Sequence, residues 1–171
     1  MEHKDTKTQR AALSVKTQRT ESVKTQSVIP QEEYDRLQQL SNTVIGAAIE
    51  VHRELGPGLL ESVYEECLRV ELESMGLKVK TQVDLPLTYK GIDTGKDFRI
   101  DMLVEDIFIV ELKAVEMMKP LHEVQLLTYM KLADIHMGLL INFNVSVLKE
   151  GIKRKINGRL ENANIIHIKD W

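Results

Sequence analysis

Apolar residues recur every three or four positions along residues 30–76, which is the period of an α-helix. Pro30 suits the first turn of a helix, and the apolar stripe after it consists of Leu37, Leu40, Val44, Ala48, Val51 and Leu55. Gly56-Pro57-Gly58 interrupts the pattern, and Gly76 ends a second stripe, which consists of Tyr64, Leu68, Leu72 and Met75. The spacing therefore predicts two helices that each bury one face.

After Gly76 the pattern changes to strict alternation of apolar and polar residues, which is the period of a β-strand. One face of this run consists of Val79, Thr81, Val83, Leu85, Leu87 and Tyr89. Pro86 lies inside the run and cannot donate a ladder hydrogen bond, so we expect an edge strand or a bulge there.

The remaining apolar runs predict three more strands, one helix and a final hairpin. Strands are expected over residues 98–104, 107–113 and 137–143, and a helix from Pro120 to about Ala133 separates the last two. Runs over residues 152–156 and 164–168 flank an Asn157-Gly158 turn and predict a peripheral hairpin. This order of elements predicts one α/β domain over residues 30–171.

Residues 1–29 differ from this domain because they contain almost no large apolar side chains. Lys-Thr-Gln recurs there at positions 7, 16 and 24 and no period buries a face, so we expect a disordered tail. The 171-residue chain is 43% hydrophobic and 29% charged, which is enough for a full core. Its apolar runs are far shorter than the roughly 18 to 20 residues that span a bilayer, and the N-terminus has no signal-peptide core. We therefore expect a cytoplasmic protein with no membrane partner.

The charge distribution limits how the protein could bind nucleic acid. The net charge is −3, but residues 1–29 and 149–171 each carry +3, so the residues between them carry −9. Strong non-specific DNA binding needs a basic face, so nucleic acid would be held locally, through a metal or through a partner. Lys153, Arg154 and Lys155 form a small basic run that could contact phosphates or simply face solvent. Cys67 is the only cysteine, which excludes a disulfide framework, and we expect it in the core.

Three charged residues lie in two adjacent predicted strands, where core residues are expected. Asp101 lies in the first strand, and Glu111 and Lys113 lie in the second. A charge inside an apolar strand is costly unless it is paired or binds a metal. Carboxylate-held Mg²⁺ can neutralise a phosphate, generate hydroxide and stabilise a leaving oxygen. The pattern therefore favours a magnesium site with Asp101 and Glu111 as direct ligands.

The neighbours of these residues extend the site. Leu112 presents its backbone to the same edge as the charged positions beside it, so its carbonyl is a further candidate ligand. Lys113 shares the strand face of Glu111 and could orient the attacking water or stabilise charge on the phosphate. Arg99 lies on the strand face of Asp101, and we expect it to pair with a carboxylate.

These ordered motifs resemble a known family. Asp101, Glu111-x-Lys113 and then Gln125-x-x-x-Tyr129 on the following helix resemble the RecB-like branch of the PD-(D/E)XK nuclease superfamily. Gly58-Leu59-Leu60-Glu61-Ser62-Val63-Tyr64 resembles the signature of the GxxExxY proteins within it. The resemblance covers about residues 40–156 and implies a restriction-endonuclease-like core, with a mixed sheet of four or five strands flanked by helices. The proline usual before the first aspartate is Ile100 here.

The resemblance also implies roles for residues outside the two strands. Gln125 and Tyr129 would position metal-bound water, the nucleic-acid backbone or active-site side chains. Glu61 would be a further metal ligand or orient one through water, although a glutamate in a helix first turn is favourable without any function. Accessory candidates are Tyr64, His122 and His52, and a surface position is an equal alternative for the two histidines.

The hairpin register decides whether the two carboxylates can meet. Residues paired across an antiparallel hairpin point to the same face, so Asp101 and Glu111 share a face only if paired residue numbers have an even sum. We therefore expect a three- or five-residue loop or a bulge near residues 104–107, with Asp106 in a left-handed conformation. With that register Asp101, Glu111 and Lys113 would converge beneath the helix that bears Glu61.

Together these patterns predict a Mg²⁺-dependent nuclease, with Mn²⁺ as a substitute ion, that acts on nucleic acid, with DNA favoured over RNA. Two alternatives stay open. One is a non-catalytic module that binds nucleic acid or protein through the same fold. The other is a metal-dependent hydrolase of nucleotides, which the acidic body favours. A protein partner or a homodimer is a further candidate.

Overall fold

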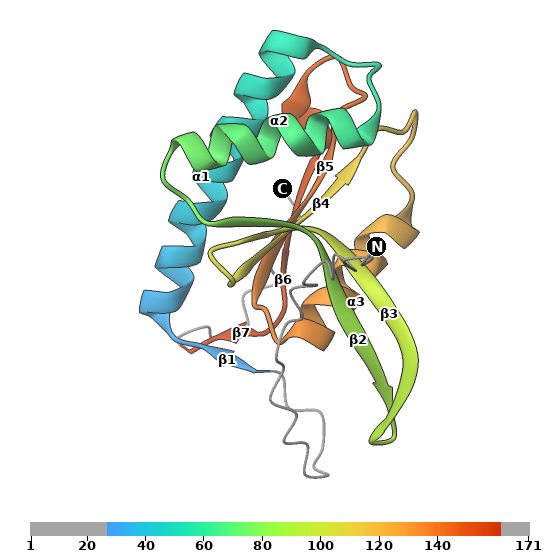
Figure 1. The fold of residues 1–171 in the computed structure, drawn as a ribbon. Helices are drawn as coiled ribbons and strands as arrows, with labels where there is room; N and C mark the ends of the chain where they lie inside the picture. Colours follow the sequence, from blue (N-terminus) through green and yellow to red (C-terminus); the bar gives the residue numbers. More distant parts are fainter. Residues whose placement is uncertain (1–26, 162–171) are drawn as a thin grey trace, which may run out of the picture.

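A five-stranded sheet with helices on both faces forms the centre of the protein (Figure 1). The computed structural model describes residues 27–161. The helices are α1 (Gln31–Leu55), α2 (Glu61–Ser74), α3 (Pro120–Ala133) and the short 3₁₀ helix η1 (Leu148–Gly151). The strands are β1 (Val28–Ile29), β2 (Val79–Tyr89), β3 (Ile92–Val104), β4 (Phe108–Lys113), β5 (Met137–Asn142), β6 (Ile152–Ile156) and β7 (Arg159–Leu160). Within residues 27–161, no helix is long and apolar enough to cross a membrane.

The central sheet has the strand order β2-β3-β4-β5-β6. β4 and β5 are parallel and the other neighbours are antiparallel. A parallel pair needs a crossover connection, which α3 supplies. The prediction of a mixed sheet of four or five strands flanked by helices is therefore confirmed. β6 was expected in a peripheral hairpin but is the edge strand beside β5, and its expected partner over residues 164–168 lies outside the described residues.

Each face of the sheet has its own hydrophobic core. Consecutive residues of β4 show the division, because Val110 packs in the core beneath α1 and α2, whereas Ile109 packs in the core beneath α3. α3 can lie close to β5 because Gly138 has no side chain. A Cβ atom there would lie 2.9 Å from the Ile109 carbonyl oxygen and 3.0 Å from Leu126 Cδ1.

The predicted buried stripes of the first two helices are confirmed except where the helices end. The buried members are Leu37, Leu40, Val44, Ala48, Val51, Tyr64, Leu68 and Leu72. Leu55 and Met75 are exposed instead. Leu55 is the last residue of α1 and Met75 caps α2, so no further helical turn continues the stripe there. Cys67 packs against the same core but is only partly buried.

β2 and β3 form a long ribbon whose outer part extends beyond the rest of the sheet (Figure 1). The register shifts between Pro86 and Thr88, which confirms the irregularity expected at Pro86, and β2 is an edge strand. Val83 and Leu85 are buried, but Tyr89 near the tip is exposed, contrary to the expected buried face. Beyond the irregularity, residues 88–97 are all exposed. The alternation of apolar and polar residues there therefore does not mark a buried face.

β1 corrects the domain boundary expected at Pro30. Val28–Ile29 pairs in parallel with β7, and the side chain of Ile29 is fully buried. The backbone N–H groups of Arg159 and Glu161 donate to the carbonyls of Ser27 and Ile29. A two-residue strand is too short to show a period, which is why the sequence pattern did not indicate it. Residues 1–26 of the expected tail lie outside the described residues.

Candidate active site

The hairpin of β3 and β4 has the register that the two carboxylates require. Met102 pairs with Val110 and Val104 pairs with Phe108, so the sums of paired numbers are even. Three residues connect the strands, and Asp106 has a φ of 58°. The expected three-residue loop and the left-handed Asp106 are therefore confirmed, and the preceding residue, Glu105, is left-handed as well.

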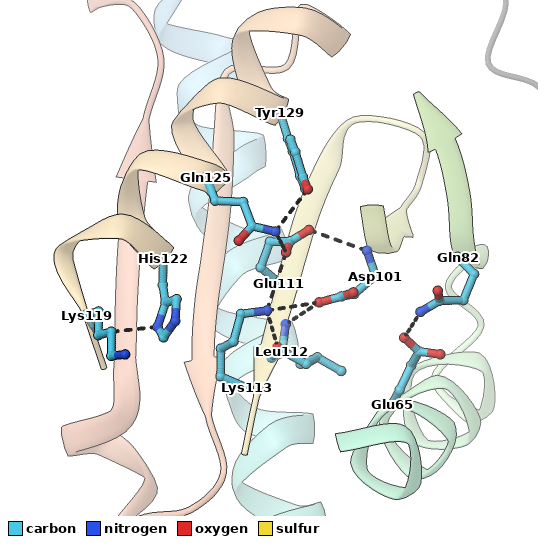
Figure 2. A network of polar contacts seen from close by, with 10 residues as sticks. All are labelled: Glu65, Gln82, Asp101, Glu111, Leu112, Lys113, Lys119, His122, Gln125 and Tyr129. Carbon is cyan, nitrogen blue, oxygen red and sulfur yellow. Dashed lines mark hydrogen bonds and ion pairs between the residues drawn. The ribbon is translucent and has the colours of Figure 1, made fainter. Parts of the chain in front are cut away.

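Asp101 and Glu111 meet where the two strands stop pairing (Figure 2). The Leu112 N–H donates to Asp101 Oδ2 at 2.9 Å, and the Asp101 N–H lies 3.4 Å from Glu111 Oε1. Each carboxylate thus accepts from backbone of the opposite strand in place of a ladder hydrogen bond. Buried backbone donors need such partners, so this exchange stabilises the separation of the strands while it holds the two carboxylates together.

Lys113 lies between three oxygen groups of the site. Its Nζ atom donates to the Leu112 carbonyl at 2.6 Å and lies 3.7 Å from both Asp101 Oδ2 and Glu111 Oε2. All three charged side chains are largely buried, and Glu111 is only 1% exposed. In this structure the ammonium group is therefore the cation that balances the two carboxylates.

Burial dominates the electrostatics of Glu111. Loss of solvation, followed by the nearby charge of Asp101, raises the pKa of Glu111 to about 8, although Lys113 lowers it. The site therefore favours one protonated carboxyl group near neutral pH when Lys113 is its only cation. A divalent ion bound here would favour the ionised form and release that proton.

α3 contributes Gln125 and Tyr129 to the same network. The Gln125 side-chain nitrogen donates to Tyr129 OH at 2.9 Å and to Glu111 Oε2 at 3.4 Å (Figure 2). Burial is also the main reason why the pKa of Tyr129 is raised. His122 is not in this network, because its Nδ1 accepts from the Lys119 N–H at the start of α3. The polar stripe expected on this helix therefore reaches the site through its later two members only.

α2 approaches the site from the other side of the sheet. Its apolar face belongs to the core that contains Val110, so α3, not the helix that bears Glu61, covers Glu111 and Lys113. This corrects the expected arrangement. Burial raises the pKa of Glu61, whose carboxylate also interacts with Lys113, Asp101 and the backbone of Ala114. The first turn of α2 therefore lies at the margin of the site.

Tyr64 and His52 make contacts with the loops and the core beside the site. Tyr64 is fully buried, stacks on Phe143 with ring centres 4.4 Å apart, and donates its hydroxyl hydrogen to the Gly56 carbonyl at 2.6 Å. The Leu59 N–H donates to the same hydroxyl at 3.1 Å. His52 Nε2 lies 2.9 Å from the Val145 carbonyl oxygen.

The other charged candidates form structural pairs. Arg99 Nε lies 3.5 Å from Asp84 Oδ1, as expected for pairing with a carboxylate. Lys155 pairs with Glu123 of α3, whereas Arg154 contacts Gln38 and Asn42 of α1. Successive residues of β6 point to opposite faces of the sheet, so residues 153–155 do not form one basic patch.

The oxygen groups at the strand separation fit a divalent cation. Two carboxylates and the Leu112 carbonyl surround the Lys113 ammonium, and Mg²⁺ and Mn²⁺ prefer oxygen ligands. Among residues 27–161, however, no cluster of three or more His, Cys, Asp or Glu side chains could hold a metal ion. Any third ligand would thus be the carbonyl, water or a moved Glu61.

Sequence reasoning missed two residues at the edge of the site. Gln82 of β2 donates to Glu65 of α2 at 2.6 Å (Figure 2), and the pKa of Glu65 is raised, mainly by burial. Glu65 lies one helical turn after Glu61, which was the available signal. Gln82 gave no signal, because a glutamine on the polar side of a strand is ordinary.

The sequence profile described as PD-(D/E)XK nuclease superfamily matches residues 38–155. The chain belongs to this superfamily. The matched segment of this PD-(D/E)XK protein runs from α1 to β6 and includes all the residues of the site. Neither the curated proteins nor the solved structures gave a significant match. Assignment to the GxxExxY group stays a prediction.

Proposed function

We propose that this PD-(D/E)XK protein is a Mg²⁺-dependent nuclease, with Mn²⁺ as a substitute, that hydrolyses phosphodiester bonds of nucleic acid. The observation that carries the proposal is the meeting of Asp101, Glu111 and the Leu112 carbonyl around one positive charge. Two carboxylates from adjacent strands on one buried cation are costly to maintain as a purely structural feature. They are the ligands that a phosphate-directed metal site needs.

The residues of the chain would divide the work as follows. Asp101, Glu111 and the Leu112 carbonyl would hold the ion, with Glu61 reaching it directly or through water. When bound, the ion would neutralise phosphate charge and lower the pKa of water. Lys113 would then turn its ammonium group to the phosphate, where negative charge develops in the transition state.

Gln125 and Tyr129 would orient the Glu111 carboxylate. Gln125 donates toward Glu111 and to Tyr129, so it fixes the direction of the Glu111 carboxylate. The Tyr129 ring contacts Phe98 of β3, with centres 5.4 Å apart, which fixes the phenol in turn. Their loss should therefore slow cleavage without abolishing it.

The experiment is cleavage of labelled single- and double-stranded DNA and RNA with Mg²⁺, Mn²⁺ or EDTA. DNA is the favoured substrate, and the RNA arm tests that preference. We expect metal-dependent cleavage by the wild type that Asp101→Asn and Lys113→Ala abolish. The asparagine side chain keeps an acceptor for the Leu112 N–H but removes the charge. Lys131→Ala, an exposed change on α3, is the matched control and should cleave normally.

Other results would identify the alternatives. Equal cleavage by wild type and Lys113→Ala would mean that the activity has another source. Binding of nucleic acid without cleavage would indicate a non-catalytic binding module, and cleavage of nucleotides alone would indicate a nucleotide hydrolase. A cytoplasmic location and a protein partner or homodimer stay proposals for separate tests.

A further inference from the structure

The ribbon of β2 and β3 turns sharply beside the site. Thr81 pairs with Met102 and Val83 pairs with Ile100, so these two pairs lie on the same side of the ribbon. Met102 nevertheless packs in the core beneath α1 and α2, whereas Val83 and Ile100 pack in the core beneath α3. The ribbon must therefore rotate between the two pairs, at Gln82 and Asp101.

Gln82 has the backbone conformation that produces this turn. Its φ is 52°, in the left-handed region, which an L-residue in the middle of a strand rarely adopts. The ladder passes from Thr81–Met102 to Val83–Ile100 without a Gln82–Asp101 pair. Asp101 is consequently free to direct its N–H and its carboxylate to Glu111 and Leu112 of β4.

The side chain of Gln82 ties this turn to α2. Its amide nitrogen donates to Glu65 at 2.6 Å, and Glu65 lies one helical turn after Glu61. One face of α2 thus carries both the acid at the margin of the site and the contact that holds β2 in its left-handed turn.

We propose that Gln82 is a positioning residue for Asp101. Its left-handed backbone releases Asp101 from the β2–β3 ladder toward Glu111, and its hydrogen bond with Glu65 locks the turn against α2. The role of the positioned site as a metal centre rests on the proposed nuclease function. The position of Asp101 itself can be measured without metal, through the Leu112 N–H that donates to it.

The first test distinguishes the effect of the left-handed backbone of Gln82 from the effect of its side-chain hydrogen bond. Gln82→Gly and Gln82→Val both lose the bond to Glu65, but only valine, which is β-branched, strongly disfavours a left-handed conformation. Hydrogen exchange of the Leu112 amide in metal-free protein, followed by NMR, is the readout, and Asp101→Ala gives the rate without the acceptor. We expect exchange about tenfold faster in Gln82→Val than in Gln82→Gly. Should the valine variant not fold, Gln82→Ala takes its place.

The second test addresses the bond to α2. Glu65→Gln keeps an acceptor for Gln82, whereas Glu65→Ala removes it. Leu112 exchange should stay near the wild-type rate in the first variant and rise in the second. Lys90 at the ribbon tip is also left-handed, with a φ of 50°, so Lys90→Gly and Lys90→Val form the matched control and should leave Leu112 unchanged.

Mn²⁺ titration calorimetry on the same variants distinguishes this proposal from the proposed function. We expect about tenfold weaker Mn²⁺ binding for Gln82→Val than for Gln82→Gly. Equal Leu112 exchange in these two variants would overturn the positioning role, whether or not the protein binds metal. Faster exchange in Gln82→Val, together with no Mn²⁺ binding by the wild type, would support the positioning role and overturn the metal site.

Discussion

The ammonium group of Lys113 lies where a divalent ion would be held. It contacts the Leu112 carbonyl and lies at equal distance from the two carboxylates. A lysine and a metal ion cannot both occupy this position, because like charges in a buried site repel each other strongly. Binding of a metal at this position therefore requires Lys113 to move away from the two carboxylates and the Leu112 carbonyl.

This competition leads to the first prediction. Lys113→Met keeps the apolar length of the side chain but removes the competing charge, so Mn²⁺ affinity should stay equal or rise by up to about tenfold while cleavage is lost. Titration calorimetry of wild type and variant measures the affinity, with Lys131→Met as the control. Clearly weaker binding by Lys113→Met would show that the lysine supports the metal instead of competing with it.

The second prediction concerns pH and Glu111 in metal-free protein. The pKa of Glu111 is about 8 in the folded state against 4.5 in the unfolded chain, so folding favours its protonated form. Its contribution to stability is therefore fully present below pH 4.5 and is lost as the pH rises toward 8. Glu111→Gln has no carboxyl group at this position, so it should not lose stability in this way as the pH rises. Between pH 5 and 8, the free energy of unfolding of the wild type should fall relative to the variant by on the order of 3 kcal/mol.

Urea unfolding in EDTA at several pH values measures this difference, and the comparison with Glu111→Gln cancels the other titrating groups. A difference that does not change between pH 5 and 8 would contradict the burial of an ionisable Glu111. Added Mg²⁺ should remove the loss of stability at high pH, because a bound cation favours the ionised carboxylate.

At the residue scale, the sequence identified site residues where a charged side chain interrupts an apolar strand. Asp101, Glu111 and Lys113 are charges in apolar strands, and that conflict identified them. Gln82 shows no such conflict, because its unusual feature is a backbone angle. Tyr64 was noticed through its motif, but only the fold shows that its hydroxyl binds the loop before α2.

The loop between α1 and α2 determines where α2 begins. Tyr64, in the first turn of α2, binds two backbone groups of this loop through its hydroxyl. Its ring stacks on Phe143, directly after β5. The ring thus anchors the start of α2, and with it Glu61, to the sheet.

Tyr64→Phe gives the third prediction. The phenyl ring keeps the stacking but leaves the Gly56 carbonyl and the Leu59 N–H without this partly buried partner, so the protein should lose about 1 to 2 kcal/mol of stability. Urea unfolding measures the change, and Tyr89→Phe at an exposed position is the control. Equal stability of the two variants would mean that the hydroxyl does not hold the loop.

At the element scale, local periodicity predicted helices and strands well because one buried face imposes one period. The position of β6 was not predictable in the same way, since it depends on pairing with β5 across η1. The face assigned to β2 was correct at Val79 before Gln82 and at Val83 and Leu85 after it, but not for the whole strand. The turn at Gln82 directs the two parts to different cores, and the outer end of the strand is exposed.

At the scale of the whole molecule, the pairing of β1 with β7 joins the two ends of the part of the chain that the structure describes.

The fourth prediction compares two truncations. Removing residues 1–29 should lower the melting temperature by several degrees relative to removing residues 1–26, because only the first deletes the fully buried Ile29. Differential scanning calorimetry measures both, and Ile29→Ala in the full chain should show part of the same loss. Identical melting temperatures would show that β1 adds no stability.

The same pair of strands determines how the protein would bear a pulling force. β1 and β7 are parallel, so opposite pulls before β1 and after β7 would slide one strand along the other. The bonds from Arg159 and Glu161 would then carry the load together instead of breaking one after the other. The Asn157 N–H, just before β7, donates to the carbonyl of His136, just before β5, so the strand pair lies near the start of β5. Lys113 instead pairs with Asn142 at the end of β5. The β1–β7 hydrogen bonds, at the end of the sheet remote from the carboxylates, would therefore be the first to bear a mechanical load on the chain.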